Sequence, residues 1–384
     1  MRVVVDARAA AFPHKTGVGF YTWHMLRLLP RLDPSTTYVA WYLNAGSLLG
    51  GVRRPLRELA APNLVQRATP IPATWFERIS ERFDVPRVEW FARSDVVFAP
   101  NFVPPPTRSP LLVVTVHDLA FRRFPETAPH GTRWWLSRIE RTLARASRII
   151  TVSESTRRDL SELYGVEPGR VSVIPLGVDR ARFRPVDSDA TDPVRSRFGL
   201  DGPYLLSLGG IEPRKNLPNV VAAFARIGPG LRLVIAGSGV EWNPEGAVLL
   251  REALDSLPPE ARGRVVRTGY VSEAEKVALL SGAEALVYPS LYEGFGLPVL
   301  EAMACGTPVV TSDRSSLPEV AGGGALLVDP GDPDAIADAV ERVLSDGQLR
   351  KRLQERGMER AAGFTWEETA RRTAEVLRQA VSEG

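Results

Sequence analysis

Two glutamates, Glu293 and Glu301, stand eight positions apart in the segment YEGFGLPVLEAMACG. Pro298 suits the first turn of a helix, where its missing N–H is not needed, and Gly306 is placed to end that helix. We therefore expect Glu293 in a loop and Glu301 in the first turns of the helix. Carboxylates accept hydrogen bonds from hydroxyl groups, so this pair could bind a polyhydroxylated ligand.

The glycines between the two glutamates favour a phosphate site. Gly294 and Gly296 would let the backbone approach a ligand, and the helix N-terminus after them carries amide donors with a partial positive charge. This geometry suits a diphosphate, with Glu301 accepting from a ribose diol and Glu293 contacting a hydroxylated group beyond the phosphates. The alternative is that Glu301 only complements the helix dipole and that Glu293 is a solvated loop residue.

A pair of cations follows another apolar run. Arg214 and Lys215 stand in LSLGGIEPRKNL, after the predicted strand YLLSLGG and a turn that contains Pro213. Only four of the 48 basic residues are lysines. Because lysine is rare, we interpret Lys215 as a position that needs a compact point charge, not as a result of the overall composition. The two cations could neutralise a diphosphate; the alternative is a solvated turn.

The first half of the chain offers weaker candidates. Gly17 and Gly19 precede a predicted helix in HKTGVGFYTWHML, but Thr22 stands where a dinucleotide-binding fingerprint has its third glycine, which disfavours a Rossmann dehydrogenase. His117 ends the apolar run LLVVTV, where it could contact a ligand or be a satisfied core residue.

No convincing metal site is found in the sequence. Asp187 and Asp189 have D-x-D spacing but lie in a predicted linker, and Asp332 followed by Pro333 indicates a helix start. We expect no metal, because the two cations and the helix terminus described above can supply the positive charge.

Short β-rich apolar runs alternate with helical patterns along the chain, which predicts βα units and parallel sheets. The runs of the first half are RVVVDAR, TYVAWYLN, NLVQRAT, DVVFAP, LLVVTV, RIITVS and VSVIPLG. Those of the second half are YLLSLGG, LRLVIAGSG, RVVRTGY, EALVYPS, TPVVTSD and GALLVDP. Because ligands of such sheets bind outside the carboxyl ends of the strands, the candidates above fall at the expected edge.

Composition and length limit the class of protein. The 384 residues are 44% apolar and predict two domains. One cysteine, Cys305, excludes a disulfide framework and favours a cytoplasmic setting, and we expect neither a signal peptide nor a membrane span. Residues 1–180 carry 25 basic against 16 acidic residues and residues 181–384 carry 23 against 29, so the first half could attract an anionic partner or membrane surface. The alternative is drift in surface charge.

The segment EGFGLPVLEAMACGTPVV resembles the signature of the retaining GT-B glycosyltransferases of family 4, a glutamate, seven residues and a second glutamate. LSLGGIEPRKNL, SEAEKVALLSGAEALVYPS, VIPLGVDRARFRP and FTWEETA also resemble family segments, and together they cover most of residues 150–384. The resemblance implies an α/β fold with two Rossmann-like parallel-sheet domains facing each other across a cleft. The segment 179–202 is polar and rich in turn residues, which predicts a linker (181–202) between the halves. The last segment places Trp366, Ala370, Ala374 and Leu377 at helical spacing, which predicts an amphipathic helix. The expected parts are therefore an acceptor-binding domain (1–180), this linker, a nucleotide-sugar-binding domain (203–365) and a terminal helix that could bridge back to the first domain (366–384).

The resemblance also implies roles for particular residues. Glu301 would hold the ribose, Glu293 would contact the donor sugar, and the base would contact backbone near Tyr270 and Val271. The implied catalytic residues are His117, Glu293, Arg214 and Lys215. The implied donor-binding residues are Gly17, Gly19, Gly210, Arg214, Lys215, Tyr270, Val271, Glu293, Gly294, Phe295, Gly296, Leu297 and Glu301.

The reaction implied is transfer of a sugar from a nucleotide diphosphate sugar to a hydroxyl of a glycan or lipid-linked acceptor, with retention and without a metal. A GDP-sugar, GDP-mannose, is favoured because TGVGFYT and VTVHDLAF resemble segments of mannosyltransferase members; UDP-sugars remain open. We expect no cofactor and no nucleic-acid partner. Alternatives are a non-catalytic nucleotide-sugar-binding protein, and a nucleotide-sugar 2-epimerase of similar fold, which would lack the glutamate signature.

A membrane contact is a further expectation. The segment TWFERISERF places Trp75, Ile79 and Phe83 on one helical face with Arg78 and Arg82 nearby. Such a helix could associate with the inner face of the membrane and bring the chain to a lipid-linked acceptor. The alternative is an ordinary helix that faces the core.

Overall fold

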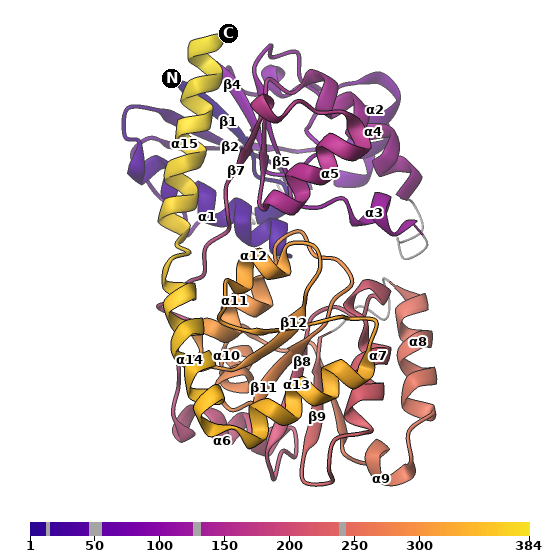
Figure 1. The fold of residues 1–384 in the computed structure, drawn as a ribbon. Helices are drawn as coiled ribbons and strands as arrows, with labels where there is room; N and C mark the ends of the chain where they lie inside the picture. The colour runs from indigo at the N-terminus through magenta and orange to yellow at the C-terminus, as the bar shows by residue number, and fades with distance from the viewer. Residues whose placement is uncertain (13–15, 46–55, 126–131, 238–242) are drawn as a thin grey trace. The chain divides into compact units, whose positions relative to one another are not determined.

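Two compact units make up the chain in the computed structural model (Figure 1). The structure describes residues 1–12, 16–45, 56–125, 132–237 and 243–384. The first unit contains Met1–Leu119, Arg133–Gly177 and Trp366–Gly384, and the second contains Ala120–Thr132 and Val178–Thr365.

The first unit is built on a seven-stranded parallel sheet of order β3-β2-β1-β4-β5-β6-β7. Its strands are β1 (Arg2–Asp6), β2 (Thr37–Leu43), β3 (Leu64–Thr69), β4 (Val96–Ala99), β5 (Leu112–Val116), β6 (Arg148–Thr151) and β7 (Val171–Val173). Its main helices are α1 (Gly17–Leu32), α2 (Ala73–Phe83), α4 (Thr132–Arg145), α5 (Glu154–Tyr164) and α15 (Trp366–Glu383). Figure 1 shows α15 on one side of this sheet and α4 and α5 on the other.

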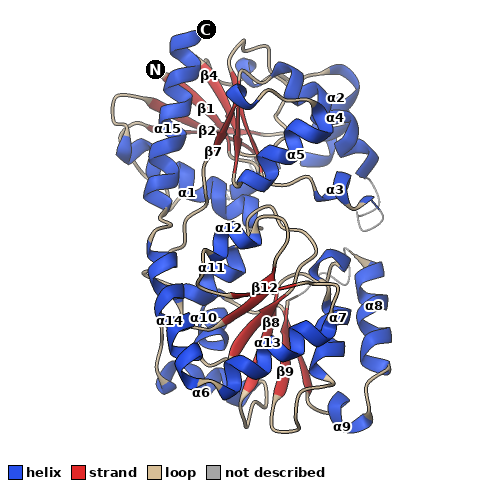
Figure 2. Ribbon diagram, viewed as in Figure 1, coloured by secondary structure: helices blue, strands red, loops and turns tan. Residues whose placement is uncertain are grey.

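The second unit is built on a six-stranded parallel sheet of order β10-β9-β8-β11-β12-β13. Its strands are β8 (Tyr204–Leu208), β9 (Arg232–Ala236), β10 (Val265–Gly269), β11 (Ala285–Tyr288), β12 (Val309–Ser312) and β13 (Leu326–Val328). Its helices are α3 (Ala120–Arg123), α6 (Ser188–Arg197), α7 (Leu217–Phe224), α8 (Pro244–Asp255), α9 (Pro259–Arg262), α10 (Glu273–Ser281), α11 (Leu297–Ala304), α12 (Leu317–Ala321), α13 (Pro333–Ser345) and α14 (Gly347–Ala362). Figure 2 shows the strands inside each unit with helices outside them.

Each of the thirteen apolar runs in the sequence contains one strand, so the predicted α/β fold with two parallel sheets is confirmed. The inner strands were recognisable because a strand covered on both faces is mainly apolar: all four residues of β4 and all five of β5 are buried.

Each sheet has a switch point where consecutive connections leave in opposite directions. In the second unit this point lies between the neighbours β8 and β11, since the chain passes from β8 to the outer β9 on one side and from β11 to β12 on the other. Loops diverge at such a point and leave a crevice outside the carboxyl ends of the strands. The loops after β8 and β11 carry Arg214, Lys215 and Glu293.

The segment 181–202, expected to be a linker, belongs to the second unit and contains α6. Asp187 is the N-cap residue of this helix, and within the helix only Thr191 is buried. A surface helix with one buried residue and an internal proline, Pro193, has no apolar stripe, which is why the pattern indicated a linker.

The terminal helix α15 packs within the first unit. Its Trp366 ring stacks on the His24 ring, with centroids 4.2 Å apart, and its Thr369 hydroxyl donates a hydrogen bond to the Pro175 carbonyl at 2.8 Å. Arg378 pairs with Asp33 at 3.1 Å. The stripe predicted for this helix is buried, at Trp366, Ala370, Ala374 and Leu377.

Candidate functional site

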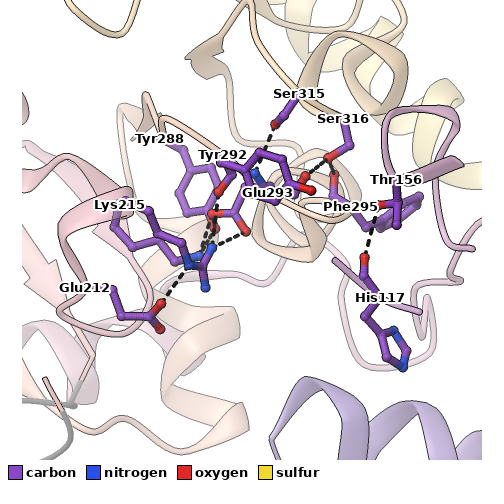
Figure 3. Close-up of polar contacts among 11 residues, drawn as sticks. His117, Thr156, Glu212, Lys215, Tyr288, Tyr292, Glu293, Phe295, Ser315 and Ser316 are labelled. Carbon is purple, nitrogen blue, oxygen red and sulfur yellow. Dashed lines mark hydrogen bonds and ion pairs between the residues drawn. The ribbon is translucent and has the colours of Figure 1, made fainter. Parts of the chain in front are cut away.

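The Glu293 carboxylate lies in a cluster of charged and hydroxyl groups in the second unit (Figure 3). Its Oε1 accepts hydrogen bonds from the Lys215 ammonium at 2.6 Å and from the Tyr288 hydroxyl at 2.8 Å. Its Oε2 accepts a hydrogen bond from Nη1 of Arg214 at 3.0 Å. Because Glu293 is 7% exposed, water screens these charges poorly and the contacts are strong.

The electrostatics of this cluster keep Glu293 ionised. Burial would raise the pKa of its carboxyl, but the charges of Lys215 and Arg214 and the hydrogen bonds from Lys215 and Tyr288 lower the pKa to about 2. Burial lowers the pKa of Lys215, and Arg214 lowers it further against the opposing effect of Glu293. Burial and the Glu293 charge raise the pKa of Tyr288, so its hydroxyl remains a donor.

The loop that carries Glu293 is held by two serines. The Glu293 amide donates to the Ser315 hydroxyl at 3.0 Å, and the Ser316 hydroxyl donates to the carbonyls of Glu293 and Phe295 at 2.9 and 2.8 Å. Gly296 ends the loop with φ at 109°, where a Cβ would lie 2.7 Å from the Leu317 side chain. The glycine is therefore required by backbone conformation and by packing.

Helix α11 begins at Leu297 with Pro298 in its first turn, and Cys305 is its C-cap residue, followed by Gly306 at positive φ. The predicted helix start and end are confirmed. Glu301 lies in the second turn of this helix, as expected.

Hydrogen bonds to neighbouring loops hold the turn that carries Arg214 and Lys215. Asn216 adopts a left-handed conformation with φ at 60°, and its side-chain amide donates to the Pro289 and Pro330 carbonyls at 3.0 and 2.6 Å. The Leu291 amide donates to the Arg214 carbonyl at 2.8 Å, which joins this turn to the loop after β11. The predicted placement of Arg214 and Lys215 at the same sheet edge as Glu293 is confirmed.

Glu301 belongs to a separate row of charges. Its Oε1 accepts a hydrogen bond from the Lys276 ammonium at 2.9 Å, and Lys276 also pairs with Oε1 of Glu273 at 3.1 Å. The ammonium lies 4.8 Å from the centroid of the Phe183 ring. The Glu301 and Lys276 side chains are 12% and 15% exposed. Burial raises the pKa of Glu301, which Lys276 counters in part.

Three further predicted donor residues follow strands of the same sheet. Gly210 follows β8, next to Gly209, where a Cβ would lie 3.5 Å from Cε of Lys215. Tyr270 and Val271 follow β10; Tyr270 is 67% exposed and Val271 is buried. These residues lead directly into α10, which carries Lys276.

Comparison with known proteins identifies the family. Residues 189–360 match the model of glycosyl transferases group 1, and residues 16–182 match that of glycosyltransferase family 4. The O-antigen chain mannosyltransferase B of Escherichia coli is 32% identical over 295 residues, which cover 75% of this chain and 76% of the relative. The chain belongs to the group 1 glycosyltransferases of family 4.

Other similarities agree with this glycosyltransferase assignment. A D-inositol 3-phosphate glycosyltransferase of a Nocardioides species is 35% identical over 291 residues, covering 71% of this chain and 63% of that protein. Among solved structures, Anabaena HepE in complex with UDP-glucose matches with a TM-score of 0.73 and 17% identity, covering 99% of this chain and 100% of that chain. At that identity the structural match supports the GT-B fold alone.

The first unit of this glycosyltransferase contains the remaining predicted residues. The His117 ring donates from Nε2 to the Pro100 carbonyl at 2.9 Å, since a carbonyl only accepts. The His117 carbonyl accepts from the Thr156 hydroxyl at 3.2 Å (Figure 3). Burial lowers the pKa of His117 below its usual value, against the raising effects of the Pro100 carbonyl and Asp118. The ring is therefore neutral at physiological pH.

From the sequence, we expect the glycines of the first unit to precede a helix. In the structure they lie inside α1. The helix begins at Gly17, and the Thr16 side chain caps it by accepting from the Gly19 amide at 3.5 Å. The difference arises because the threonine hydroxyl satisfies an amide of the first turn and so lets the helix start at a glycine. About one turn after the helix begins, Tyr21 lies against His117, with ring centroids 4.9 Å apart.

Two residues of the second-unit site, Tyr288 and Lys276, were not found from the sequence. Tyr288 is the last residue of β11. The hydrogen bond from its hydroxyl to Glu293 depends on how the strand and the loop fold, so the sequence does not reveal it. The rarity of lysine in this chain could have marked Lys276 as a candidate site residue. Its contact with Glu301, however, depends on how α10 packs on α11.

Among the described residues, no group of three or more histidine, cysteine, aspartate and glutamate side chains is arranged to hold a metal ion. No helix in the same part of the chain has both the length and the apolar character needed to cross a bilayer.

Proposed function

We propose that this glycosyltransferase moves a hexose, with mannose favoured, from a nucleotide diphosphate sugar to a hydroxyl of a glycan or lipid-linked acceptor. The proposal includes retention at the anomeric carbon and no metal ion. The observation that carries it is the buried Glu293 carboxylate held by Lys215, Arg214 and Tyr288 at the switch point of the second sheet.

The charges of the site suit a diphosphate. The two positive charges of Arg214 and Lys215 contact two carboxylates: Glu293 binds both cations, and Glu212 pairs with Arg214 at 2.7 Å. The Glu212 side chain is 38% exposed, so water already competes for its contact with Arg214. A bound diphosphate can therefore take over the outer side of both cations while Glu293 keeps them oriented from below.

The proposed chemistry needs positioning and charge stabilisation more than a strong base. As the sugar–phosphate bond breaks, negative charge grows on the leaving diphosphate, where Lys215, Arg214 and the N-terminus of α11 stabilise it. The acceptor attacks from the face that the diphosphate leaves, and a phosphate oxygen takes the hydroxyl proton. Glu293 accepts hydrogen bonds from hydroxyls of the donor sugar and fixes its ring for that attack.

Mannose is favoured for two reasons. The first-half segments TGVGFYT and VTVHDLAF resemble mannosyltransferase segments, and the E. coli relative is itself named a mannosyltransferase. The base is proposed as guanine, because the same first-half segments favour GDP-mannose, with uracil as the alternative. Tyr270 and Val271 would present mainly backbone groups to the base and so do not distinguish the two.

Calorimetric titration tests the donor site. We expect one of GDP, UDP and ADP to bind with a clear preference. Glu301→Ala should weaken the binding of that nucleotide by about 10-fold to 100-fold, because charged hydrogen bonds to the ribose are lost. Lys351→Met, at a side chain 76% exposed in the same unit, is the control and should bind normally. If the folded wild-type protein binds none of the three, the donor site is wrong.

A transfer assay separates the proposed reaction from its alternatives. Incubation with GDP-mannose should release GDP slowly without acceptor and faster with a suitable glycan acceptor, and proton NMR of the product should show the anomeric configuration of the donor. Nucleotide binding without any turnover would favour a non-catalytic binding protein. Interconversion of the free sugar nucleotide would favour a 2-epimerase.

Helix α2 supports the lipid-linked acceptor. Trp75, Ile79 and Phe83 lie four residues apart on one face and are 65%, 38% and 62% exposed, so the predicted alternative of a core-facing stripe is wrong. Only Phe76 and Ser80 of this helix are buried. The stripe is thus a second face, separate from the one that packs on the unit.

The arginines of α2 complete a pattern suited to an anionic lipid surface. Arg78 and Arg82 fall beside the exposed stripe at helical spacing, whereas Glu77 and Glu81 fall on the far side from it. Aromatic side chains enter the interface of a bilayer while arginines reach the phosphates. We therefore include association with an anionic membrane surface in the proposal.

Vesicle sedimentation tests this contact. The wild-type protein should co-sediment with phosphatidylglycerol vesicles, and a Trp75→Ser/Phe83→Ser variant should bind at least about 10-fold more weakly, because two aromatic side chains no longer enter the interface. Trp90→Ser is the matched control, because Trp90 is 62% exposed but lies outside α2. Equal binding of all three proteins would show that α2 is not the contact.

A further inference from the structure

We infer that Lys276 is a positioning residue of the donor site: it binds one carboxylate oxygen of Glu301 and leaves the other directed at the ribose of the nucleotide. The inference rests on the proposed function, in which Glu301 accepts hydrogen bonds from the ribose diol. It adds a residue that the glutamate signature does not contain.

The contact between the two side chains is one-sided. Lys276 donates to Oε1 of Glu301 at 2.9 Å, and in the part of the chain that the structure describes the Glu301 carboxylate makes no other hydrogen bond. Oε2 therefore retains its acceptor capacity for a hydroxyl from outside the protein. One carboxylate oxygen is thus bound by the ammonium, and the other keeps lone pairs that can accept hydrogen bonds from the hydroxyls of a ribose diol.

Several contacts fix the Lys276 ammonium. It pairs with Glu273, one turn earlier in α10, at 3.1 Å, and it lies over the ring of Phe183. Glu273 is held in turn by Arg182 at 3.2 Å. The result is a row of alternating charges, Arg182, Glu273, Lys276 and Glu301, that extends from the chain before α6 through α10 to α11. An ammonium held in this way has little freedom to leave Glu301.

Burial makes the cation necessary. Glu301 is 12% exposed, and burial raises the pKa of its carboxyl, which favours the neutral form. Lys276 opposes this effect and stabilises the ionised form, which accepts hydrogen bonds at both oxygens. The same contact that orients Glu301 therefore also preserves its charge.

Lysine usage supports a selected role. The structure describes three of the four lysines: Lys215 pairs with Glu293, Lys276 pairs with Glu301, and Lys351 is an exposed residue of α14. An arginine tends to bind a carboxylate through both oxygens at once, whereas an ammonium is a point charge that can occupy one. In a chain that otherwise prefers arginine, the lysine beside Glu301 occupies one carboxylate oxygen and leaves the other as an acceptor, whereas at Glu293 the second oxygen is bound by Arg214.

The test compares a nucleotide with its 2′,3′-dideoxy form. GDP, UDP and ADP and their dideoxy forms are titrated by calorimetry into wild type, Lys276→Met and the control Lys351→Met. We expect Lys276→Met to weaken the binding of the preferred ribonucleotide by about 10-fold or more, because one charged hydrogen bond is lost. Binding of its dideoxy form should weaken by less than about twofold. The control should leave both affinities unchanged.

The outcomes separate this inference from the proposed function. Equal losses for both nucleotide forms in Lys276→Met, or no loss for either, would overturn it. If Glu301→Ala abolishes the preference for ribose while Lys276→Met retains it, the donor site stands and only the role of Lys276 fails. If wild type binds no nucleotide, both fail. Should Lys276→Met not fold, Lys276→Gln, which keeps polarity without charge, gives the same comparison.

Discussion

Lys215→Met is expected to lower kcat for sugar transfer by about 10²-fold to 10³-fold, the usual effect of removing one group that stabilises charge in a transition state. In the proposed reaction Lys215 faces a diphosphate whose negative charge grows as the sugar leaves. Its contact is therefore worth more in the transition state than in the bound donor, and KM should change much less than kcat. Initial rates of product formation over a range of donor concentrations measure both constants.

The variant must be shown to fold, because methionine leaves the Glu293 carboxylate with Arg214 and Tyr288 only. Breaking a buried pair in this way costs about 3 kcal/mol of unfolding free energy. Circular dichroism and thermal melting check this, and the double variant Lys215→Met/Glu293→Gln removes the unbalanced charge. It should recover stability but not activity. A folded Lys215→Met protein with the wild-type kcat would show that the ammonium does not act on the leaving group.

Thirteen strands could be predicted because their signal is local. A parallel strand covered on both faces is mainly apolar, as β5 is at every residue except Thr115, and no contact with a distant segment is needed to recognise it. Helix α6 could not be predicted, since a surface helix that buries only Thr191 leaves no periodic apolar stripe. Local patterns identify elements that carry an apolar run or stripe and miss those, such as α6, that carry neither.

Parts of the candidate site were predictable for a different reason. Arg214, Lys215 and Glu293 each follow an apolar run, and parallel strands bring all such positions to one edge of the sheet. The direct contacts of both cations with Glu293 were not predictable, because they depend on the order β8-β11 within the sheet. Sequence order separates these strands by two others, and only the fold makes them neighbours.

The division of the chain into units also depends on contacts between distant residues. Residues 120–132 stand in the first half of the sequence but belong to the second unit, where Phe124 packs against Tyr292 with ring centroids 5.8 Å apart. Nothing in the composition of that segment differs from its surroundings. A boundary drawn from polarity and turn residues therefore places it with the first domain.

Three glycines at the carboxyl ends of β8, β9 and β10 form a close contact that can be tested. Gly209, Gly237 and Gly269 all have positive φ, at 138°, 149° and 69°. The Gly209 amide donates to the Ala236 carbonyl at 2.9 Å, and the Gly237 amide donates to the Gly269 carbonyl at 2.9 Å. The three strand ends are thus joined backbone to backbone beside the loop that leads to Lys215.

Gly237→Ala is expected to destabilise the protein by more than about 4 kcal/mol. Losses of this size are seen only when a substitution causes a severe steric clash or leaves a buried polar or charged group without a partner. The added Cβ would lie 1.8 Å from the Gly209 carbonyl oxygen, and that oxygen is backbone held by the sheet, so no side-chain movement can relieve the clash. Urea unfolding followed by circular dichroism measures the loss, and any folded fraction should bind nucleotide poorly because Gly209 adjoins Lys215.

Two matched substitutions separate the clash from the cost of backbone conformation. Gly269→Ala also has a positive φ, at 69° in the left-handed helical region, but meets no atom within 4 Å, so it should lose only about 1–2 kcal/mol. Gly230→Ala has open space and no positive φ, and it should be within about 0.5 kcal/mol of wild type. A Gly237→Ala protein as stable as Gly269→Ala would mean that the two loops do not approach as closely as the structure shows. The graded order, with Gly237→Ala far below the others, would establish that the ligand edge of this sheet is built on a backbone contact that only glycine permits.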